Sequence, residues 1–223
     1  MVDQKRTVRQ KMDIYVNDRK IDYKPLFPLS WGNLFQNMLQ DEKYIPKNHG
    51  IISITTNEQE AIQVMTEQSD KLVPEDLEVL RVFTKDSVSI CKDGFDKVLT
   101  LIESIKTEIA SAADFYREGN IKEASGKVVN VMEAFKPMVN FIQSVGISFS
   151  LNFDEISFNE NTNLREKIES FLTTLSELVA AQQKKDYVEI ADYLEYQLIE
   201  DMTDWSRLVS ILMKEVESGA RQS

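Results

Sequence analysis

The chain has 223 residues and a net charge of −11, with 42% hydrophobic and 28% charged residues. This composition is ordinary for a folded protein and excludes a wholly disordered chain, and the length suffices for one large or two small domains. A single cysteine, Cys91, excludes an intrachain disulfide, and no run approaches the roughly 18 apolar residues that a membrane span requires. We therefore expect a cytoplasmic protein.

The charge is unevenly distributed along the chain. Residues 1–85 contain 12 Lys or Arg and 13 Asp or Glu, whereas residues 86–223 contain 14 and 24. The second part would repel phosphate backbones and anionic lipid headgroups, so we expect neither a nucleic-acid nor a membrane partner. Such a surface would attract a basic protein segment, and the plain alternative is the solvated exterior of a helical domain.

Residues 1–11 are basic and charged, with no apolar core behind them. They therefore do not have the pattern of a secretory signal, and we expect a flexible tail.

Residues 12–85 are expected to form a small domain of strands and one helix. Asn17 and Asp18 supply turn chemistry between two short alternating segments, which predicts a hairpin. Ser30 is expected to cap a short helix. The apolar face of this helix contains Trp31, Leu34, Phe35 and Met38. Strands are predicted over residues 12–16, 20–23, 50–55, 61–65 and 77–83.

This order of strand, strand, helix, strand, short strand and strand, over about residues 11–85, resembles the ubiquitin-like β-grasp fold. In conjugating modifiers and sulfur carriers of that fold, the last strand is followed by a reactive diglycine tail. Here Thr84-Lys85 leads directly into a predicted helix, which excludes conjugation and sulfur transfer. The resemblance therefore implies a small binding module.

Beyond Lys85 the apolar period changes from 2 to about 3.5 residues, which is typical of packed amphipathic helices. We expect an antiparallel four-helix bundle over residues 86–218, built from helical hairpins at 86–145 and 163–217. The four apolar stripes contain Val88, Cys91, Phe95, Val98, Ile102, Ile105, Ile109, Ala112 and Tyr116; Ile121, Ala124, Val128, Met132, Phe135, Met138 or Val139, Ile142 and Val145; Leu164, Ile168, Phe171, Leu175 and Leu178; and Tyr187, Ile190, Leu194, Leu198, Trp205, Leu208, Leu212 and Val216.

The two hairpins match at a constant shift of 66 residues, which places Ile102 on Ile168 and Val128 on Leu194. The second helix of each hairpin begins with a predicted capping box, at 120–123 and at 186–189. Matching caps at the same shift favour an internal repeat. Pro137 should kink the second helix.

Residues 146–162 connect the hairpins and alternate apolar with small polar side chains, which is a strand-like pattern. We interpret them as an extended crossover that docks on the bundle or on the sheet. The alternative is a partner-binding element formed by Phe149, Leu151 and Phe153.

The sequence contains no pattern typical of a catalytic or metal site. The only histidine, His49, is expected in a turn, and Cys91 lies on an apolar stripe. No phosphate-binding, dinucleotide-binding or nucleophile-elbow motif occurs. We therefore expect neither a cofactor nor an enzymatic activity. A carboxylate-based, metal-dependent hydrolase remains an alternative, because residues 200, 201 and 204 are acidic and one helical turn apart.

The fourth predicted helix also carries an aromatic and acidic strip. Tyr193 and Tyr196 lie off the apolar stripe among Asp192, Glu195 and Glu200, and aromatic residues with a polar rim are favoured at interfaces. The leading hypothesis is a non-enzymatic adaptor, chaperone or scaffold that binds a basic or helical segment of another protein. The helical half resembles the small acidic helical chaperones of bacterial secretion and flagellar export. A structural subunit of a homo- or hetero-oligomeric assembly is the alternative.

Overall fold

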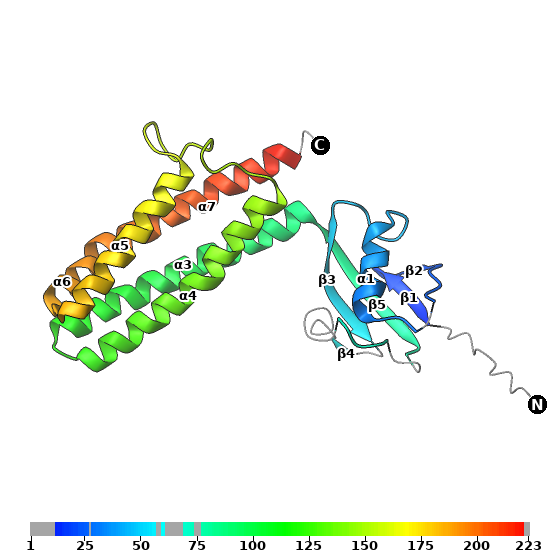
Figure 1. Cartoon of the computed structure of the whole chain (residues 1–223), viewed down its shortest axis with the longest axis horizontal. Helices are drawn as coiled ribbons and strands as arrows, with labels where there is room; N and C mark the ends of the chain where they lie inside the picture. The colour runs from blue at the N-terminus through cyan, green and yellow to red at the C-terminus, as the bar shows by residue number, and fades with distance from the viewer. Residues whose placement is uncertain (1–11, 27, 57–58, 61–68, 74–76, 221–223) are drawn as a thin grey trace, which may run out of the picture. The chain divides into compact units, whose positions relative to one another are not determined.

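The computed structural model describes residues 12–26, 28–56, 59–60, 69–73 and 77–220. The protein is α+β, with a small sheet in its N-terminal part and helices in its C-terminal part (Figure 1). It forms two compact units, Met1–Ile90 and Cys91–Ser223, which are described in turn. The predicted tail over residues 1–11 lies outside the described residues. Among the described residues, no helix is long and apolar enough to cross a membrane.

The sheet of the N-terminal unit has five strands in the order β2-β1-β5-β3-β4. β1 pairs antiparallel with β2 and parallel with β5, while β3 pairs antiparallel with both β5 and β4. The β1–β2 connection is the predicted two-residue turn: Asn17 and Asp18 have φ values of 48° and 63°, as a type I′ turn requires. The strands are β1 (Asp13–Val16), β2 (Arg19–Ile21), β3 (His49–Thr56), β4 (Gln59–Glu60) and β5 (Val79–Asp86).

The helix α1 (Trp31–Gln40) packs on this sheet through the face that the sequence predicts. The Ser30 hydroxyl accepts a hydrogen bond from the Asn33 backbone N–H at 3.3 Å, which confirms the predicted N-cap. The buried face of α1 shares one core with β1, β3 and β5, formed by Trp31, Leu34, Phe35, Met38, Ile14, Val16, Ile54, Leu80 and Val82.

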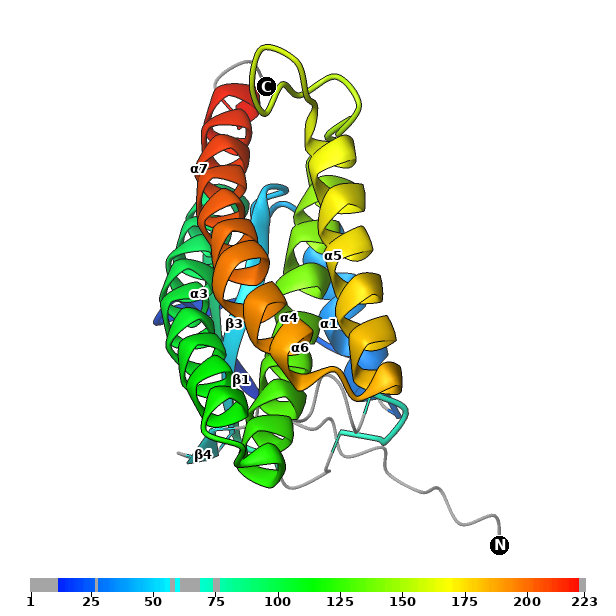
Figure 2. The same cartoon turned by 90° about the vertical axis from the view of Figure 1, so that its left-hand side faces the viewer.

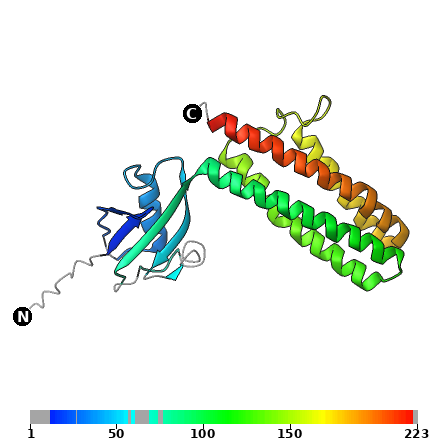
Figure 3. The same ribbon diagram turned by 180° about the vertical axis from the view of Figure 1, so that it is seen from behind.

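The strands occupy the predicted regions with bounds shifted by one to three residues, except where the structure does not describe the chain. The strand predicted over residues 61–65 lies outside the described residues, and β4 instead pairs with β3 at Gln59–Glu60. β5 continues to Asp86, and α3 begins at the next residue (Figure 3). At this junction the backbone N–H and the hydroxyl of Ser87 both donate to the Asn48 carbonyl oxygen, each at 2.7 Å.

The C-terminal unit contains four helical rods that lie side by side (Figures 1 and 2). They are α3 (Ser87–Arg117), α4 (Ile121–Ser148), α5 (Leu164–Lys184) and a fourth rod in which α6 (Tyr187–Asp192), the π-helix η1 (Tyr193–Leu198) and α7 (Ile199–Ala220) follow one another. α4 is a single helix that includes Pro137.

Aromatic pairs join the rods around one apolar core. Phe95 on α3 meets Phe141 on α4 at a ring-centroid distance of 5.3 Å. Phe171 on α5 meets both Phe135 on α4, at 5.1 Å, and Trp205 on α7, at 5.3 Å. The predicted stripes supply most of this core. Six of their members are only half-buried, namely Val88, Ile121, Met132, Ile168, Leu175 and Tyr187.

The turns after α3 and α5 have the same backbone geometry at a shift of 66 residues. Gly119 and Lys185 both have positive φ, 79° and 57°. Each turn closes with the same two hydrogen bonds, which satisfy the last carbonyls of the helix. They are Gly119 N to Tyr116 O (3.1 Å) and Asn120 N to Phe115 O (2.9 Å) after α3, and Lys185 N to Gln182 O (3.1 Å) and Asp186 N to Ala181 O (3.2 Å) after α5.

The predicted capping boxes are only partly present. Asp186 accepts a hydrogen bond from the Glu189 backbone N–H at 3.0 Å, but the Asn120 side chain makes no capping hydrogen bond among the described residues. A complete capping box instead joins Asn163 and Glu166 at the start of α5. The sequence motif places the two groups one turn apart, but it does not set the rotamer of a water-exposed side chain such as that of Asn120.

The prediction of an extended crossover over residues 146–162 is wrong, because this segment has a different backbone conformation. α4 continues to Ser148, and the backbone N–H groups of Phe149 and Leu151 donate back to the last turn of α4. Turns follow, and residues 149–163, which are all described, form only one isolated bridge, between Ser157 and Asn163. Half-buried and exposed residues nevertheless alternate over 149–154. The two-residue period of the sequence therefore indicates which side chains are partly buried, and it does not indicate a strand.

Close contact between α3 and α4 generates a prediction. A Cβ at Gly94 would overlap the Phe141 ring, whereas a Cβ at Gly126 would meet nothing within 4 Å. We expect Gly94→Ala to lower the free energy of unfolding by about 1–3 kcal/mol, and Gly126→Ala to raise it by about 0.5–1 kcal/mol through helix propensity. Denaturant unfolding of both variants measures this. Equal changes in the free energy of unfolding for the two substitutions would contradict the close approach of Gly94 to the Phe141 ring.

Candidate functional site

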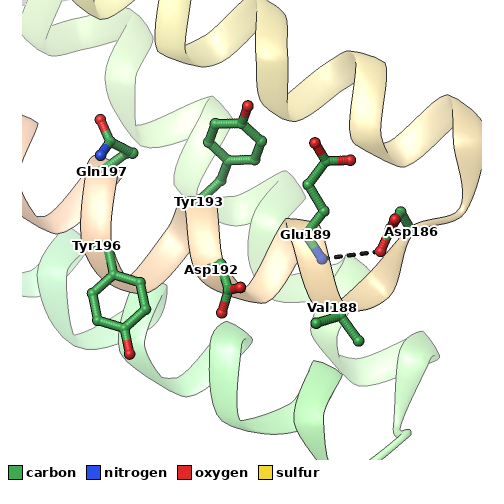
Figure 4. A pocket seen from close by; sticks show the side chains of 7 residues that line it. All are labelled: Asp186, Val188, Glu189, Asp192, Tyr193, Tyr196 and Gln197. Atoms are coloured by element: carbon green, nitrogen blue, oxygen red, sulfur yellow. Dashed lines mark hydrogen bonds between the residues drawn. The ribbon is translucent and has the colours of Figure 1, made fainter.

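The candidate site is an open depression of about 500 Å³ on the fourth rod (Figure 4). We call its lining the α6–η1 face; it comprises Asp186, Val188, Glu189, Asp192, Tyr193, Tyr196 and Gln197. All seven come from the first part of the fourth rod. The side chains lie on the outer side of that rod because Ile190, Leu194 and Leu198, on its inner side, are buried in the core.

Two rows of side chains at four-residue spacing build this face. Val188, Asp192 and Tyr196 point to one side of the rod, and Glu189 and Tyr193 point to the other, towards α5 (Figure 4). Val188 is 74% exposed and Tyr196 is 62% exposed. The face therefore offers apolar and aromatic surface to solvent between carboxylates, a combination typical of protein contact sites.

Acidic side chains dominate the electrostatics of the face. The Arg117 guanidinium, at the end of α3, donates a hydrogen bond to the Glu195 carboxylate and lies 3.8 Å from the Asp192 carboxylate. The hydrogen bond to Glu195 is the main reason that the pKa of Arg117 is raised. One guanidinium cannot balance the carboxylates of Asp186, Glu189, Asp192 and Glu195, so the face is negative.

Tyr193 contributes a hydroxyl that stays protonated. Desolvation raises the pKa of this hydroxyl, and the carboxylates of Glu177 and Glu189 raise it further. Because phenols already titrate near pH 10, the hydroxyl remains a hydrogen-bond donor at neutral pH. Tyr193 can therefore donate to a partner, while the carboxylates around it accept.

The structure brings together only some of the residues that the sequence singled out. Asp192, Tyr193 and Tyr196 line the depression, Glu195 lies beside it in the ion pair with Arg117, and Glu200 lies on α7 outside the lining. Sequence reasoning overlooked the place of Val188 in this face. The four-residue steps from Tyr196 back through Asp192 would have located it.

The proposed partner-binding residues of the connecting segment lie elsewhere in the unit. Phe149, Leu151 and Phe153 are half-buried, and the Phe153 ring would lie 2.9 Å from a Cβ at Gly146. Leu151 also borders a second depression, together with Glu155, Ile156 and Glu215. The three apolar side chains are therefore partly covered, Phe153 against α4 at Gly146, and they take no part in the α6–η1 face.

The acidic residues proposed for a hydrolase are arranged around an ammonium group. Lys167 on α5 forms an ion pair with Asp204 and lies 3.7 Å from Asp201, whereas Glu200 is exposed. Asp201 is buried, and its Oδ2 has no hydrogen-bond partner among the described residues. In the described part of the chain, no group of three or more His, Cys, Asp or Glu is placed to hold a metal ion.

The other two candidate reactive residues serve the fold. His49 lies in β3 and not in the predicted turn, and its Nδ1 is 3.2 Å from the Thr84 hydroxyl. Cys91 is buried, and desolvation raises the pKa of its thiol, which suppresses the reactive thiolate.

The buried carboxylate of Asp201 generates a pH prediction. Desolvation is the main reason that its pKa is raised; the neighbouring acids Asp204 and Glu200 add to this, and Thr174 and Lys167 oppose it. A raised pKa means that the folded state binds the proton more tightly. This contribution to stability is therefore present at low pH and is lost as the pH rises through the folded-state pKa.

We accordingly expect Asp201→Asn to gain stability relative to the wild type as the pH rises from about 4 to about 7. Urea unfolding at several pH values measures the difference between the two proteins. Thr203→Ala, an exposed change two residues away on the opposite side of α7, serves as the control and should follow the wild-type pH profile. If the difference in the free energy of unfolding between Asp201→Asn and the wild type does not change with pH, the raised pKa of Asp201 is contradicted.

Comparison with known proteins adds one finding. A family model described as a domain of unknown function, DUF8042, matches residues 93–208, which is more than half of the chain. The chain therefore belongs to the DUF8042 family. No curated protein and no solved structure matches it.

Proposed function

We propose that this DUF8042 protein is a non-enzymatic adaptor, chaperone or scaffold that binds a basic helical segment of another protein on the α6–η1 face. One observation carries the proposal: Val188 and Tyr196 stay exposed on a concave, negatively charged surface. Single exposed apolar side chains are ordinary on a helix exterior, but here an aliphatic and an aromatic side chain lie in one depression among carboxylates. A partner that covers them would remove apolar area from water.

Charge complementarity identifies the chemistry of the partner. Lys or Arg side chains spaced four residues apart on a helix would match the four-residue rows that contain Glu189 and Asp192. Their aliphatic stems would cover Val188, and their charged ends could stack on the ring of Tyr196. A helix pre-orders these groups, which lowers the entropic cost of binding.

The proposal includes the finer architecture of both units. The strand order β2-β1-β5-β3-β4, with parallel β1 and β5 at the centre and α1 packed on the sheet, supports a β-grasp domain. The matching turns at Gly119 and Lys185, with the aromatic contacts between rods, support an antiparallel four-helix bundle of two repeated hairpins. A cytoplasmic location accords with a single cysteine that is free and buried.

The side chains that a catalytic reaction could use support a binding role instead, because they are engaged in contacts within the fold. Lys167 pairs with Asp204 and lies next to Asp201, His49 contacts Thr84, and Cys91 packs in the core. Each of these groups is already engaged within the fold.

A synthetic amphipathic peptide tests the proposal. We design a helix of about 20 residues, roughly 30 Å long, with Leu along one stripe and Arg and Lys along its edges. Its matched control has Glu in place of every Arg and Lys. We expect the basic peptide to bind with an affinity that falls with added salt, and the acidic peptide not to bind, as fluorescence anisotropy measures.

Variants of the face identify the site of binding. The affinity for the basic peptide should fall at least about tenfold in the double variant Glu189→Lys with Asp192→Lys, and also in the single variant Tyr196→Ala. Glu160→Lys, an exposed change in the connecting segment, should change the affinity less than about twofold. Equal binding of both peptides, or equal affinity in the face variants and the control, would overturn the proposal.

A further inference from the structure

The helix α5 has a second apolar stripe beside the one that it buries in the core of the four rods. Phe171, Thr174 and Leu178 are buried. The residue that follows each of them is apolar, and it lies about 100° further around the helix axis. This second stripe, which we call the outer seam, consists of Ile168, Leu172, Leu175 and Val179.

The outer seam remains in contact with water. Leu172 is 57% exposed and Val179 is 42% exposed. Ile168 and Leu175 are half-buried. The four residues recur at steps of four, three and four, which is the spacing by which two helices pack side by side in a coiled coil. A continuous apolar row with this spacing on a solvent-facing side is typical of a surface that another helix covers.

The side of α5 that carries the outer seam is also poor in charge. Between Ser170 and Gln183 the only charged residue is Glu177. Its carboxylate raises the pKa of Tyr193, so it faces η1, on the side of α5 opposite the seam. Residues 86–223 as a whole contain 24 acidic and 14 basic residues. Two copies of the chain that meet along the outer seam therefore avoid the repulsion between carboxylates that this excess of acid would otherwise cause.

The outer seam is symmetric about the middle of α5. Its steps of four, three and four residues read the same in both directions, and its midpoint lies next to Thr174, the middle residue of the helix. In an antiparallel pair of α5 helices, Ile168 of one copy would face Val179 of the other. Leu172 would face Leu175 in the same way. The seam therefore complements itself, as the interface of a two-fold dimer requires.

The charges at the ends of α5 favour the antiparallel arrangement. Glu166 and Glu169 lie near the start of the helix, and Lys184 and Lys185 lie at its end. A two-fold axis through the middle of α5 places the basic end of each copy beside the acidic start of the other, and it sets the two helix dipoles in opposite directions. Parallel helices would instead bring like charges together.

We propose that two copies of this chain form a symmetric dimer by antiparallel packing of their α5 helices along the outer seam. The dimer does not depend on the proposed function, because the lining of the α6–η1 face contains no residue of the seam. A single pair of helices buries less area than a standard protein–protein interface. The dissociation constant of the dimer is therefore about 1–100 µM.

Sedimentation velocity of the full chain at about 1–500 µM tests the dimer. We expect the mass to rise with concentration from that of one chain to that of two. Leu172→Glu introduces a carboxylate from each copy into the seam and should raise the dissociation constant at least about tenfold. Thr173→Glu is the matched control, because it adds the same charge at the next exposed position, outside the seam, and should raise the constant less than about threefold. Both positions are exposed, so both variants should melt at the wild-type temperature.

Cysteine substitutions test the antiparallel register. In this register the two copies of residue 172 lie within one helical turn of each other along the axis, whereas the two copies of residue 179 are about 16 Å apart along it. A short thiol cross-linker should therefore join two chains of Leu172→Cys but not two chains of Val179→Cys. The native Cys91 is buried, so the wild type serves as the blank.

Three results would overturn the proposal. A chain that stays monomeric up to about 500 µM would leave the outer seam to a different protein. A dimer that Leu172→Glu and Thr173→Glu weaken equally, or an assembly of more than two chains, would place the contact elsewhere. Cross-linking of both cysteine variants would indicate parallel helices and refute the antiparallel packing.

Discussion

The burial of four apolar stripes against one another governs the rest of the helical unit. Each rod is free in principle to rotate about its axis, and contacts such as Phe171 with both Phe135 and Trp205 remove that freedom. Once the inner side of a rod is set, its outer side is set too. The exposure of Tyr196 and Asp192 is therefore a consequence of the burial of Leu194 and Leu198.

The apolar core also continues past η1, where the backbone of the fourth rod is π-helical. A core packed at crystal-like density cannot accept a side chain turned out of register, since the loss for one large apolar residue is several kcal/mol. Leu194, Leu198 and Trp205 are all buried, so the apolar stripe of the fourth rod continues through the π-helix.

One polar group in the core follows a different rule. Asp201 is buried between rods, and one of its oxygens has no hydrogen-bond partner among the described residues. Lys167, which also pairs with Asp204, compensates its charge only in part. Such a group costs stability relative to an apolar side chain, but it favours the pairing of α5 with α7 in which the ammonium and the carboxylates meet. The acids that looked suitable for metal chemistry are, in this arrangement, part of the packing between two helices.

The sequence by itself determined the features that depend on neighbours in the chain. The Asn17-Asp18 turn, the Ser30 cap, the buried face of α1 and the start of the fourth rod at Tyr187 all follow from local chemistry and periodicity. Only the tertiary structure decided that 149–154 would not form a strand, that Asp201 would be buried, and that Tyr193–Leu198 would be π-helical. A period reports which side chains are buried, but the backbone path that buries them depends on the shape and charge of distant rods, which no local pattern contains.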